Sequence, residues 1–343
     1  MANPFIPDEI LLDIFSRLPA KSVVRYRSLS KKWRTVLSTK HFVELHLARN
    51  PHQESFIFIS SEHLTVHSID KIEGAAAAVS RKIELPNKCL RVVGSCDGLV
   101  LLRNDEGGIF LLNPVTLQFA SVLPASPRQA LIHFKFGFGY DSSVDDYKIF
   151  RYYVRDLVIP GVFLDVYSVR GGFWKSVENP AYIPNHFEIG HGAFLNGAIH
   201  WLAKKPIELD YRIAAFDFAR EVFDEILLPI GIDEDGFVLR YKLVVFDGCL
   251  CLVEYKMNSG TDVWIMKDYG VAESWTKYDF RGELTPLCYI HKGEDVLVSK
   301  SGSLHFYNLK ERKSRGVVVD GGAVMLREGC MFAGSIVSPF ADN

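Results

Sequence analysis

The sequence predicts a small all-α domain over residues 1–49 and an all-β propeller over residues 50–343, with six four-stranded blades closed by a C-terminal strand. Three observations support this fold class. Apolar residues recur at helical spacing near the start, two strand patterns then repeat about every fifty residues, and three repeats begin with Asp-Gly or Asn-Gly. These dipeptides are the strongest short-range signal for a β-hairpin. The 24 Phe and 14 Tyr residues also favour strands.

The first fifty residues are predicted to contain three to four short helices. Pro7 suits the start of the first helix, where its missing N–H is not needed, and Pro19 ends that helix. Between them the apolar residues form one broad helical face: Ile10, Leu11, Ile14, Phe15 and Leu18. A domain of about 40 residues rarely buries such a face alone, so the face is expected to bind a partner.

Residues 6–34 resemble an F-box, most closely the version in plant F-box proteins that carry an F-box-associated domain. Leu18-Pro19, the spaced Arg25 and Arg27, and Ser-Lys-Lys-Trp at residues 30–33 carry the resemblance, which covers about residues 4–49. It implies a segment that docks on a Skp-type adaptor and, through it, on a cullin, while the rest of the chain selects a protein for ubiquitination. The alternative is a helical subdomain that folds onto the main body.

The resemblance also implies which residues contact the adaptor. The apolar helical face should lose solvent on binding, with the two prolines fixing the helix ends. The expected adaptor-binding residues are Pro7, Ile10, Leu11, Ile14, Leu18, Pro19, Val23, Val24, Leu29 and Trp33.

Charge is unevenly distributed along the chain. Residues 1–49 contain nine Lys/Arg and four Asp/Glu, a net charge of +5, although the whole chain has a net charge of −2 and the remainder therefore −7. A basic helical segment can bind phosphates, but no Lys/Arg run in it exceeds two residues. Adaptor docking with a solvated basic rim is therefore favoured, and no nucleic-acid partner is expected.

The cysteines and the hydropathy pattern bound the cellular context. Six cysteines are present without a Cys-x-x-Cys pair or a His pairing at zinc spacing. No signal-type apolar region stands at the start, and no apolar stretch reaches about 18 residues. We therefore expect a reduced protein of the cytoplasm, the nucleus or both, with no metal, no cofactor and no membrane partner.

Two strand patterns repeat through the body. One includes six anchors spaced 45, 55, 49, 50 and 41 residues apart, at residues 64–68, 110–113, 165–168, 215–217, 264–267 and 305–308. The other precedes each anchor, at residues 55–60, 97–102, 146–152, 196–201, 247–252 and 294–298. Four strands per unit of about fifty residues match kelch-like propeller blades. An open solenoid or a pair of β-sandwiches is the alternative.

The first blade lacks an inner strand, because its first strand follows the helices almost directly. Residues 329–338 contain strand-forming residues but no anchor of their own. We expect this run to complete the first blade and close the ring, so that no sheet edge stays open.

The body also resembles the F-box-associated domain of the same plant family. The signature is Phe-Gly-Phe-Gly-Tyr-Asp at residues 136–141 followed by Asp-Asp-Tyr-Lys at residues 145–148. Asn113-Pro114, the Asn196-Gly197 and His200-Trp201 pairs, and Trp264 with residues 274–276 fit the same pattern. The resemblance covers about residues 55–310.

Enzyme signatures are weak. The sequence contains no Gly-x-Ser-x-Gly, His-Glu-x-x-His or Walker motif, and Gly137-Phe-Gly139 lacks the third glycine of a dinucleotide loop. His63 and His67 lie in a predicted strand, about 13 Å apart. We interpret the acidic residues 233–235 as a solvated loop and His200 as a structural histidine. No catalytic residue is assigned, and any ligase chemistry belongs to partners.

The sequence therefore predicts a non-catalytic substrate-recognition subunit of a Skp–cullin–F-box ubiquitin ligase. A non-degradative F-box scaffold and a self-incompatibility-type F-box protein are alternatives. A propeller enzyme is a remote alternative, which would need convergent carboxylate or histidine ligands on the inner strands.

The substrate surface is predicted on one propeller face. Loops that join second to third strands, and fourth strands to the next blade, emerge together on that face. Arg and Tyr are enriched at binding hot spots, although isolated surface residues of these types are also ordinary solvated positions. The expected protein-substrate-binding set is Arg128, Arg155, Tyr182, His186, Lys204, Tyr255 and Lys256.

Overall fold

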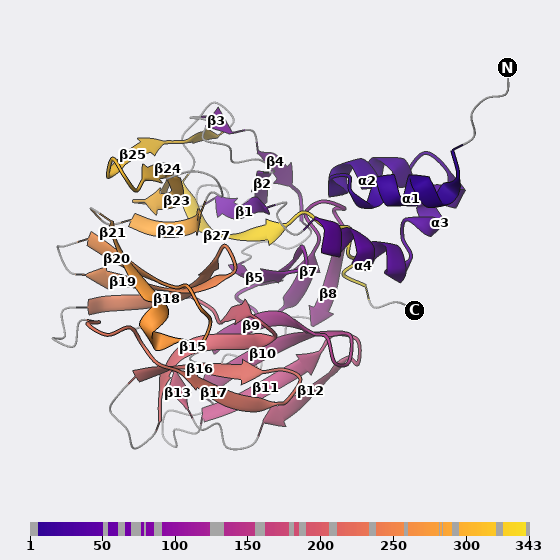
Figure 1. Ribbon diagram of the computed structural model, residues 1–343. Helices are drawn as coiled ribbons and strands as arrows, with labels where there is room; N and C mark the ends of the chain where they lie inside the picture. Colours follow the sequence, from indigo (N-terminus) through magenta and orange to yellow (C-terminus); the bar gives the residue numbers. More distant parts are fainter. Residues whose placement is uncertain are drawn as a thin grey trace.

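The computed structural model shows a four-helix N-terminal domain beside a six-bladed β-propeller (Figure 1). It describes residues 6–50, 54–60, 66–69, 77–78, 80–85, 91–123, 134–154, 162–177, 182–184, 190–205, 211–232, 238–256, 260–280, 282, 284–289, 295–319 and 325–340. The predicted fold class is confirmed.

The helical domain consists of α1 (Asp8–Ser16), α2 (Ala20–Arg27), α3 (Lys31–Val36) and α4 (Lys40–Arg49). Pro7 and Pro19 occupy the cap positions that precede α1 and α2. At the starts of α3 and α4 a hydroxyl oxygen accepts a hydrogen bond from a backbone N–H. Ser30 Oγ accepts from Trp33 at 3.2 Å, and Thr39 Oγ1 accepts from Phe42 at 3.4 Å. These caps satisfy amides that the first helical turn leaves unpaired.

Aromatic packing holds the short helices together. The Phe15 ring of α1 lies 4.7 Å from the Tyr26 ring of α2 and 5.0 Å from the Trp33 ring of α3, measured between ring centroids. The guanidinium of Arg27 donates two hydrogen bonds to the carbonyl of Leu37, at 2.6 and 3.2 Å. None of these helices is long enough to be stable alone in water, so tertiary contacts stabilise them.

The first three blades follow the helices, with strands given from the propeller axis outward. Blade 1 contains β27 (Leu326–Ala333), β1 (Glu54–Ser60), β2 (Val66–Ile69) and β4 (Arg81–Ile83). Blade 2 contains β5 (Arg91–Cys96), β6 (Leu99–Arg103), β7 (Ile109–Leu112) and β8 (Phe119–Leu123). Blade 3 contains β9 (Phe134–Asp141), β10 (Asp146–Val154), β11 (Val162–Ser168) and β12 (Phe173–Val177).

Blade 4 has a divided inner strand. Both β13 (Ile183–Pro184) and β14 (Ala193–Leu195) pair with β15 (Ala198–Lys204), which is followed by β16 (Tyr211–Asp217) and β17 (Val222–Ile226). Blade 5 contains β18 (Val238–Phe246), β19 (Cys249–Lys256), β20 (Gly260–Met266) and β21 (Trp275–Phe280), with the short 3₁₀-helix η1 (Ala272–Ser274) before β21. Blade 6 contains β22 (Leu284–Tyr289), β23 (Asp295–Lys300), β24 (Ser303–Asn308) and β25 (Lys313–Gly316). A parallel bridge joins β26 (Val318–Val319) to β3 (Ala77–Ala78).

The Asp-Gly and Asn-Gly dipeptides form the predicted hairpin turns between first and second strands. Asp97 and Gly98 have φ angles of 50° and 81°, and the corresponding residues of blades 4 and 5 also have positive φ. Two consecutive residues at positive φ fit a turn whose twist matches that of the flanking strands. The strand registers of blades 2, 4 and 5 follow from these turns.

The C-terminal strand closes the ring, as predicted. β27 pairs with β1 in antiparallel register, from Ala333 opposite Glu54 to Leu326 opposite Ser60. The pairing begins earlier than residue 329 and ends at Ala333. After Ala333 the chain leaves the sheet. The carbonyl oxygens of Ser335 and Val337 there accept hydrogen bonds from Asn113 Nδ2, at 3.2 and 2.7 Å.

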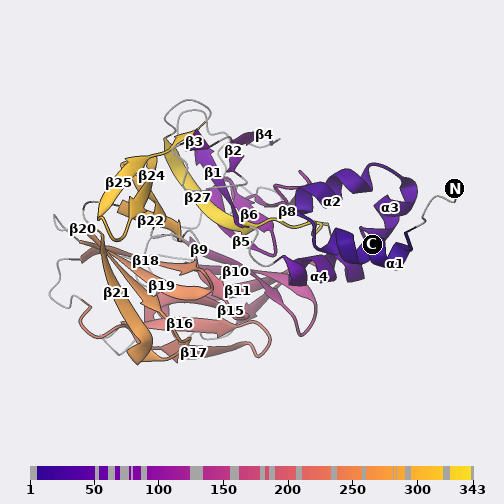
Figure 2. The same ribbon diagram turned by 45° about the horizontal axis from the view of Figure 1, so that its top comes forward.

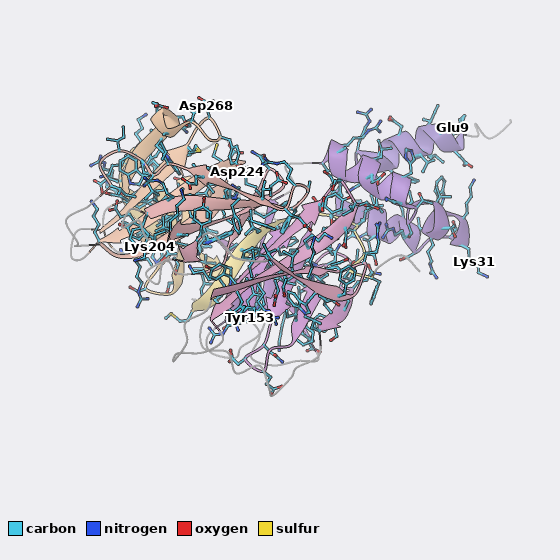
Figure 3. All side chains as sticks on the ribbon, turned by 90° about the horizontal axis from the view of Figure 1, so that it is seen from below. Glu9, Lys31, Tyr153, Lys204, Asp224 and Asp268 are labelled. Atoms are coloured by element: carbon cyan, nitrogen blue, oxygen red, sulfur yellow. The ribbon has the colours of Figure 1, made fainter. Side chains whose placement is uncertain are left out.

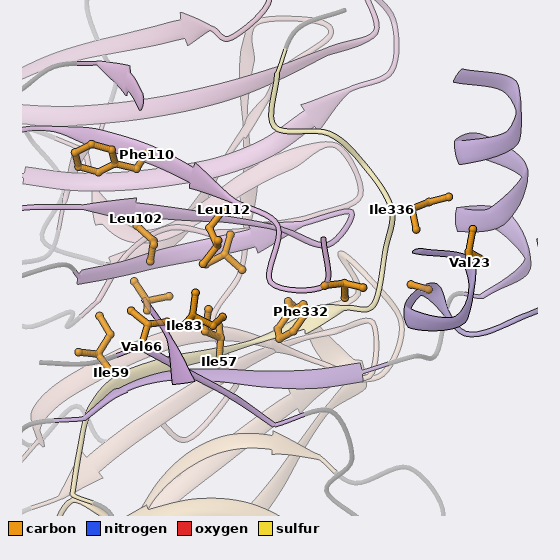
Figure 4. Close-up of a cluster of buried hydrophobic side chains, with 14 of the residues drawn as sticks. Val23, Ile57, Ile59, Val66, Ile83, Leu102, Phe110, Leu112, Phe332 and Ile336 are labelled. Carbon is orange, nitrogen blue, oxygen red and sulfur yellow. The ribbon is translucent and has the colours of Figure 1, made fainter. Parts of the chain in front are cut away.

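A hydrophobic cluster joins the helical domain to blades 1 and 2. Val23 of α2, Ile336 of the C-terminal segment and Phe332 of β27 belong to this cluster together with Ile57 and Leu102 (Figure 4). Burying each such aliphatic side chain is worth about 1.5–3 kcal/mol. The C-terminal segment therefore connects the two domains as well as closing the propeller.

Candidate binding surfaces

One side of α1 carries apolar side chains that no described residue covers. Ile6, Ile10 and Ile14 are spaced by four residues, and their exposed fractions are 49%, 52% and 43%. Ile10 and Ile14 lie on one face of α1, and Ile6 stands just before the helix begins. We call these three exposed isoleucines the outer row of α1. Ile10 and Ile14 belong to the predicted adaptor-binding set. Sequence reasoning missed Ile6, because it stands before Pro7, outside the helix that the apolar spacing predicts.

The opposite side of α1 packs into the domain. Leu11 and Leu18 are partly buried against the cluster that contains Phe15, and Val24 and Trp33 of the following helices lie in the same environment. These four predicted residues therefore support the helical domain and expose only part of their surface. Pro7 and Pro19 are exposed at the helix starts.

Val23 and Leu29 lie in opposite environments. Leu29 is 72% exposed, which fits a role in binding. Val23 has no exposed surface and packs in the cluster shared with Ile336. The prediction that Val23 contributes to an outer surface is therefore wrong, because α2 turns this side chain toward the propeller and Val24 away from the deepest part of the core.

An ionic cluster links α4 to blade 3. Lys40 of α4 and Arg170 in the turn after β11 both form ion pairs with Asp145, which also accepts a hydrogen bond from the hydroxyl of Tyr140. The hydrogen bond from Arg170, followed by those from Lys40 and Tyr140, lowers the pKa of Asp145 below its ordinary value. Burial and the neighbouring Asp145 raise the pKa of Tyr140. The charged carboxylate is thus the form that pairs with both Lys40 and Arg170.

A cavity of about 560 Å³ lies at the same junction. Lys40 and Glu44 of α4 line it from the helical domain, the turn residues Asp97 and Asp145 line it from the propeller, and residues 336–340 of the C-terminal segment complete it. The helical domain therefore faces the end of the propeller that carries the first-to-second and third-to-fourth strand turns. Figure 2 shows the helices on one side of the propeller, with α4 nearest to it.

The described residues of the predicted substrate set lie at the other end of the strands. Lys204 ends β15, and Tyr255 and Lys256 end β19, so each lies at a second-to-third strand connection. The seven residues of β15 separate Lys204 from the turn at Asn196 by about 20 Å. Figure 3 shows Lys204 well separated from Glu9 and Lys31 of the helical domain. Arg128, Arg155 and His186 lie outside the described residues.

Two members of this set contact their own fold. Tyr182 is only 4% exposed, and its hydroxyl donates a hydrogen bond to Glu225 at 2.6 Å. Its assignment to the substrate surface is therefore wrong, because the ring packs with Trp201 and Phe216 in a core cluster. Lys256 Nζ lies 2.9 Å from Asp262 Oδ2, and burial raises the pKa of Tyr255 to about 12. Lys204 and Lys256 are thus the members with a described position that carry charge at this end.

The other titratable candidates have structural partners. His200 is fully buried, with Nδ1 3.0 Å from the carbonyl of Ala193 and Nε2 2.7 Å from the hydroxyl of Tyr269, as expected of a structural histidine. Burial lowers the pKa of His200 to about 4. His67 lies in β2, whereas His63 and residues 233–235 lie outside the described part of the chain.

The described residues contain no group of three or more His, Cys, Asp or Glu side chains placed to hold a metal ion. Within the same ranges, no helix has the length and apolar character needed to span a membrane. Cys96, Cys249, Cys251 and Cys330 are free thiols.

Two family models match the two domains. The F-box domain matches residues 5–45, and the F-box associated beta propeller domain matches residues 52–325. The second match alone covers most of the chain. The chain belongs to the F-box proteins with an F-box associated propeller.

Similar proteins agree with this family. The F-box protein CPR1 of Arabidopsis thaliana is 31% identical over 299 residues, which cover 79% of this F-box protein and 72% of CPR1. An F-box/kelch-repeat protein of Arabidopsis thaliana is 28% identical and covers 88% of this chain and 87% of its own. Among solved structures, a chain of the nidogen/laminin complex has a TM-score of 0.50 at 11% identity, covering 82% of this chain and 99% of that chain. The last likeness concerns the fold alone.

Proposed function

We propose that this F-box protein is the substrate-recognition subunit of a Skp–cullin–F-box ubiquitin ligase. The outer row of α1 is the observation that carries the proposal. Its three isoleucines are exposed, as is Leu29 of the same small domain, whereas Phe15, Val23, Leu37 and Phe42 are buried. Exposed apolar patches on such a domain are typical of protein-binding sites. The F-box family match supports a Skp-type adaptor as the partner, and a cullin through it.

The propeller has the complementary role in this proposal. Its loops at the Lys204 end face away from the helical domain, so a protein substrate bound there and an adaptor bound to α1 would not compete. The ionic cluster at Asp145 and the C-terminal segment keep the two surfaces in a fixed relation. The chain would raise the effective concentration of substrate near a ubiquitin-conjugating enzyme and would itself carry out no chemical step. We place this activity in the cytoplasm, the nucleus or both.

The adaptor-binding assignment is tested with the exposed isoleucines. Replacing Ile10 and Ile14 together with Ala should weaken binding to a plant Skp-type adaptor at least tenfold, since each buried isoleucine contributes about 1.5–3 kcal/mol. Because both side chains are exposed in the free protein, the thermal midpoint should stay close to that of the wild type. Val222→Ala and Ile230→Ala, which change exposed apolar residues of the propeller region, are the matched controls.

An unchanged adaptor affinity in the Ile10/Ile14 variant, measured by calorimetry, would contradict the proposal. Affinity purification with the proteasome blocked then separates a degradative receptor from a non-degradative scaffold. Ubiquitinated proteins that co-purify with the wild type and are lost with the Ile10/Ile14 variant support the receptor. Proteins that co-purify equally with both, without ubiquitin, support the scaffold.

A further inference from the structure

Basic residues from five segments converge near the axis of the propeller. We call them the axial basic cluster: Arg91 of β5, Arg103 of β6, Lys135 of β9, His191 before β14, and Lys242 of β18. Figure 1 shows β27, β5, β9 and β18 around the middle of the propeller. All five side chains are partly buried.

A chain of contacts places four of these residues together, all but Lys135. Arg91 lies directly opposite Arg103 in the β5–β6 register. The Arg103 guanidinium lies over the Phe136 ring at 5.7 Å, and the Phe136 N–H points to His191 Nδ1 at 3.4 Å. A Cβ placed on Gly190, the neighbour of His191, would lie 3.5 Å from Lys242 Cε. The cluster is therefore continuous from β5 to β18.

Two cations of the cluster have no acidic partner in the described part of the chain. Arg91 forms ion pairs with Asp105 at 2.9 Å and Glu328 at 3.3 Å, and Glu328 also accepts the N–H of Val92. Among the residues that the structure describes, the side chains of Arg103 and Lys242 have no hydrogen-bond or ion-pair partner, and the Nε atom of Arg103 is buried without one.

His191 supplies a further hydrogen-bond donor to the cluster. Burial, with repulsion from Arg103, Lys135, Lys242 and Arg91, lowers the pKa of His191 to about 3, so the imidazole is neutral near pH 7. Its Nδ1 atom accepts the Phe136 N–H, and its proton is therefore assigned to Nε2. The cluster combines two unpaired cations with an N–H donor in a partly desolvated site.

We propose that the axial basic cluster binds a doubly negative group of the substrate protein, either a phosphorylated side chain or two neighbouring carboxylates. The charges of Arg103 and Lys242 together match the charge of a phosphate group at neutral pH. Guanidinium groups bind phosphate and carboxylate oxygens through strong, charge-assisted hydrogen bonds. A bound anion would also relieve the repulsion among partly buried cations, which is stronger there than in water.

The position of the cluster fits this role. Arg91 begins β5 and Arg103 ends β6, so both lie toward the strand ends that also carry Lys204 and Lys256, away from the helical domain. The inference rests on the proposed function only in assigning the anion to a substrate.

The test titrates the full chain with three short synthetic peptides. Two have glycine around one phosphoserine or around a Glu-Glu pair, and the third has an unmodified serine in the same place. Binding is measured by calorimetry at about 150 mM NaCl, where exposed charges are screened. We expect a charged peptide to bind at least tenfold more tightly than the serine peptide, and the tighter of the two identifies the source of the anion.

Variants locate the binding. The double variant Arg103→Gln and Lys242→Gln should lower the affinity for the tighter-binding peptide at least tenfold. Glu328→Gln should raise that affinity several-fold. Arg220→Gln with Lys175→Gln removes the same charge from exposed side chains and is the matched control, for which we expect less than a twofold change. In chloride alone, the Arg103/Lys242 variant should unfold at a thermal midpoint no lower than the wild type, because relief of the repulsion between the two cations offsets the lost contact of Arg103 with the Phe136 ring.

Equal binding of all three peptides, or an equal loss of affinity in the control variant, would overturn the inference. The adaptor-binding measurement on the same samples separates it from the proposed function. Selective anion binding without adaptor binding would contradict the receptor proposal and leave the anion site intact. Adaptor binding without selective anion binding would contradict the anion site alone.

Discussion

Lys40, in the last helix of the F-box, forms an ion pair with Asp145, which lies 105 residues later in the turn between β9 and β10. The same carboxylate pairs with Arg170 and accepts the hydroxyl proton of Tyr140. An isolated surface pair contributes less than about 1 kcal/mol. Here one carboxylate receives three donors from two domains, so its charge state matters more than any single contact.

Acid should weaken this contact. The hydrogen bonds from Arg170, Lys40 and Tyr140 lower the pKa of Asp145 in the folded protein. A lowered folded-state pKa gives stability that is complete above the unfolded-state pKa of about 4 and is lost as the pH falls toward the folded-state value. Asp145→Asn should therefore flatten the decline in denaturation midpoint below about pH 4.

The control for this acid effect is Glu273→Gln, which changes an exposed carboxylate in η1. It should leave the pH profile of the denaturation midpoint unchanged. If Asp145→Asn and the wild type decline in parallel, Asp145 does not contribute to the acid sensitivity.

Gly98 should be far less tolerant of substitution than Gly248. Both occupy the second position of an Asp-Gly turn, with φ angles of 81° and 70°. A Cβ at Gly98 would lie 2.2 Å from Ser335 Oγ and 2.5 Å from the carbonyl oxygen of Ala333, whereas a Cβ at Gly248 meets nothing within 4 Å. Gly98→Ala should lower the free energy of unfolding by about 2 kcal/mol more than Gly248→Ala. Equal losses would show that the C-terminal segment does not pack against this turn.

Deleting residues 329–343 should unfold or aggregate the propeller. The deletion removes the pairing of Ala333 with Glu54 and the hydrogen bonds from Asn113 to the C-terminal segment. It leaves β1 as an open edge strand, which promotes aggregation. A chain that ends at Phe340 keeps these contacts and is the control. A parental thermal midpoint after the longer deletion would refute closure of the ring by β27.

Val23 and Leu29 should separate stability from adaptor binding. Val23→Ala leaves a cavity in the cluster shared with Ile336 and should lower the free energy of unfolding by about 2 kcal/mol. Leu29→Ala changes an exposed side chain, so its effect on stability should stay within about 0.5 kcal/mol while adaptor affinity falls. Chemical denaturation and calorimetry measure the two quantities. Loss of stability in Leu29→Ala, with adaptor affinity kept, would contradict this division.

Local signals in the sequence were sufficient to predict the helices, strands and hairpin turns. Helical spacing placed Ile10 and Ile14 on one face, and Asp97-Gly98 placed a hairpin turn. Such signals depend on a few neighbouring residues, whose backbone preferences and side-chain periodicity persist in the fold. The missing inner strand of blade 1 was also predictable, because a ring with one strand absent has an open edge.

Side-chain environment was less predictable. Val23 and Tyr182 belong to residue types that occur both in cores and in binding surfaces, and the structure buries both. Their positions depend on how α2 meets Ile336 and how blade 4 packs around Trp201. The pattern along one helix or loop does not contain these contacts.

The sequence by itself determined the two domains, the blade repeat, the turn positions and the apolar face of α1, since each follows from local preference or from a repeated pattern. Only the tertiary structure decided that Lys40 meets Asp145 and that the Arg103 and Lys242 side chains converge near the axis with no ion-pair partner in the described ranges. Lys40 and Asp145 are 105 positions apart in the chain, and Arg103 and Lys242 are 139 positions apart. The curvature of the ring brings each pair together. Contacts of this kind depend on the packing of every blade between them, which no short segment of the chain encodes.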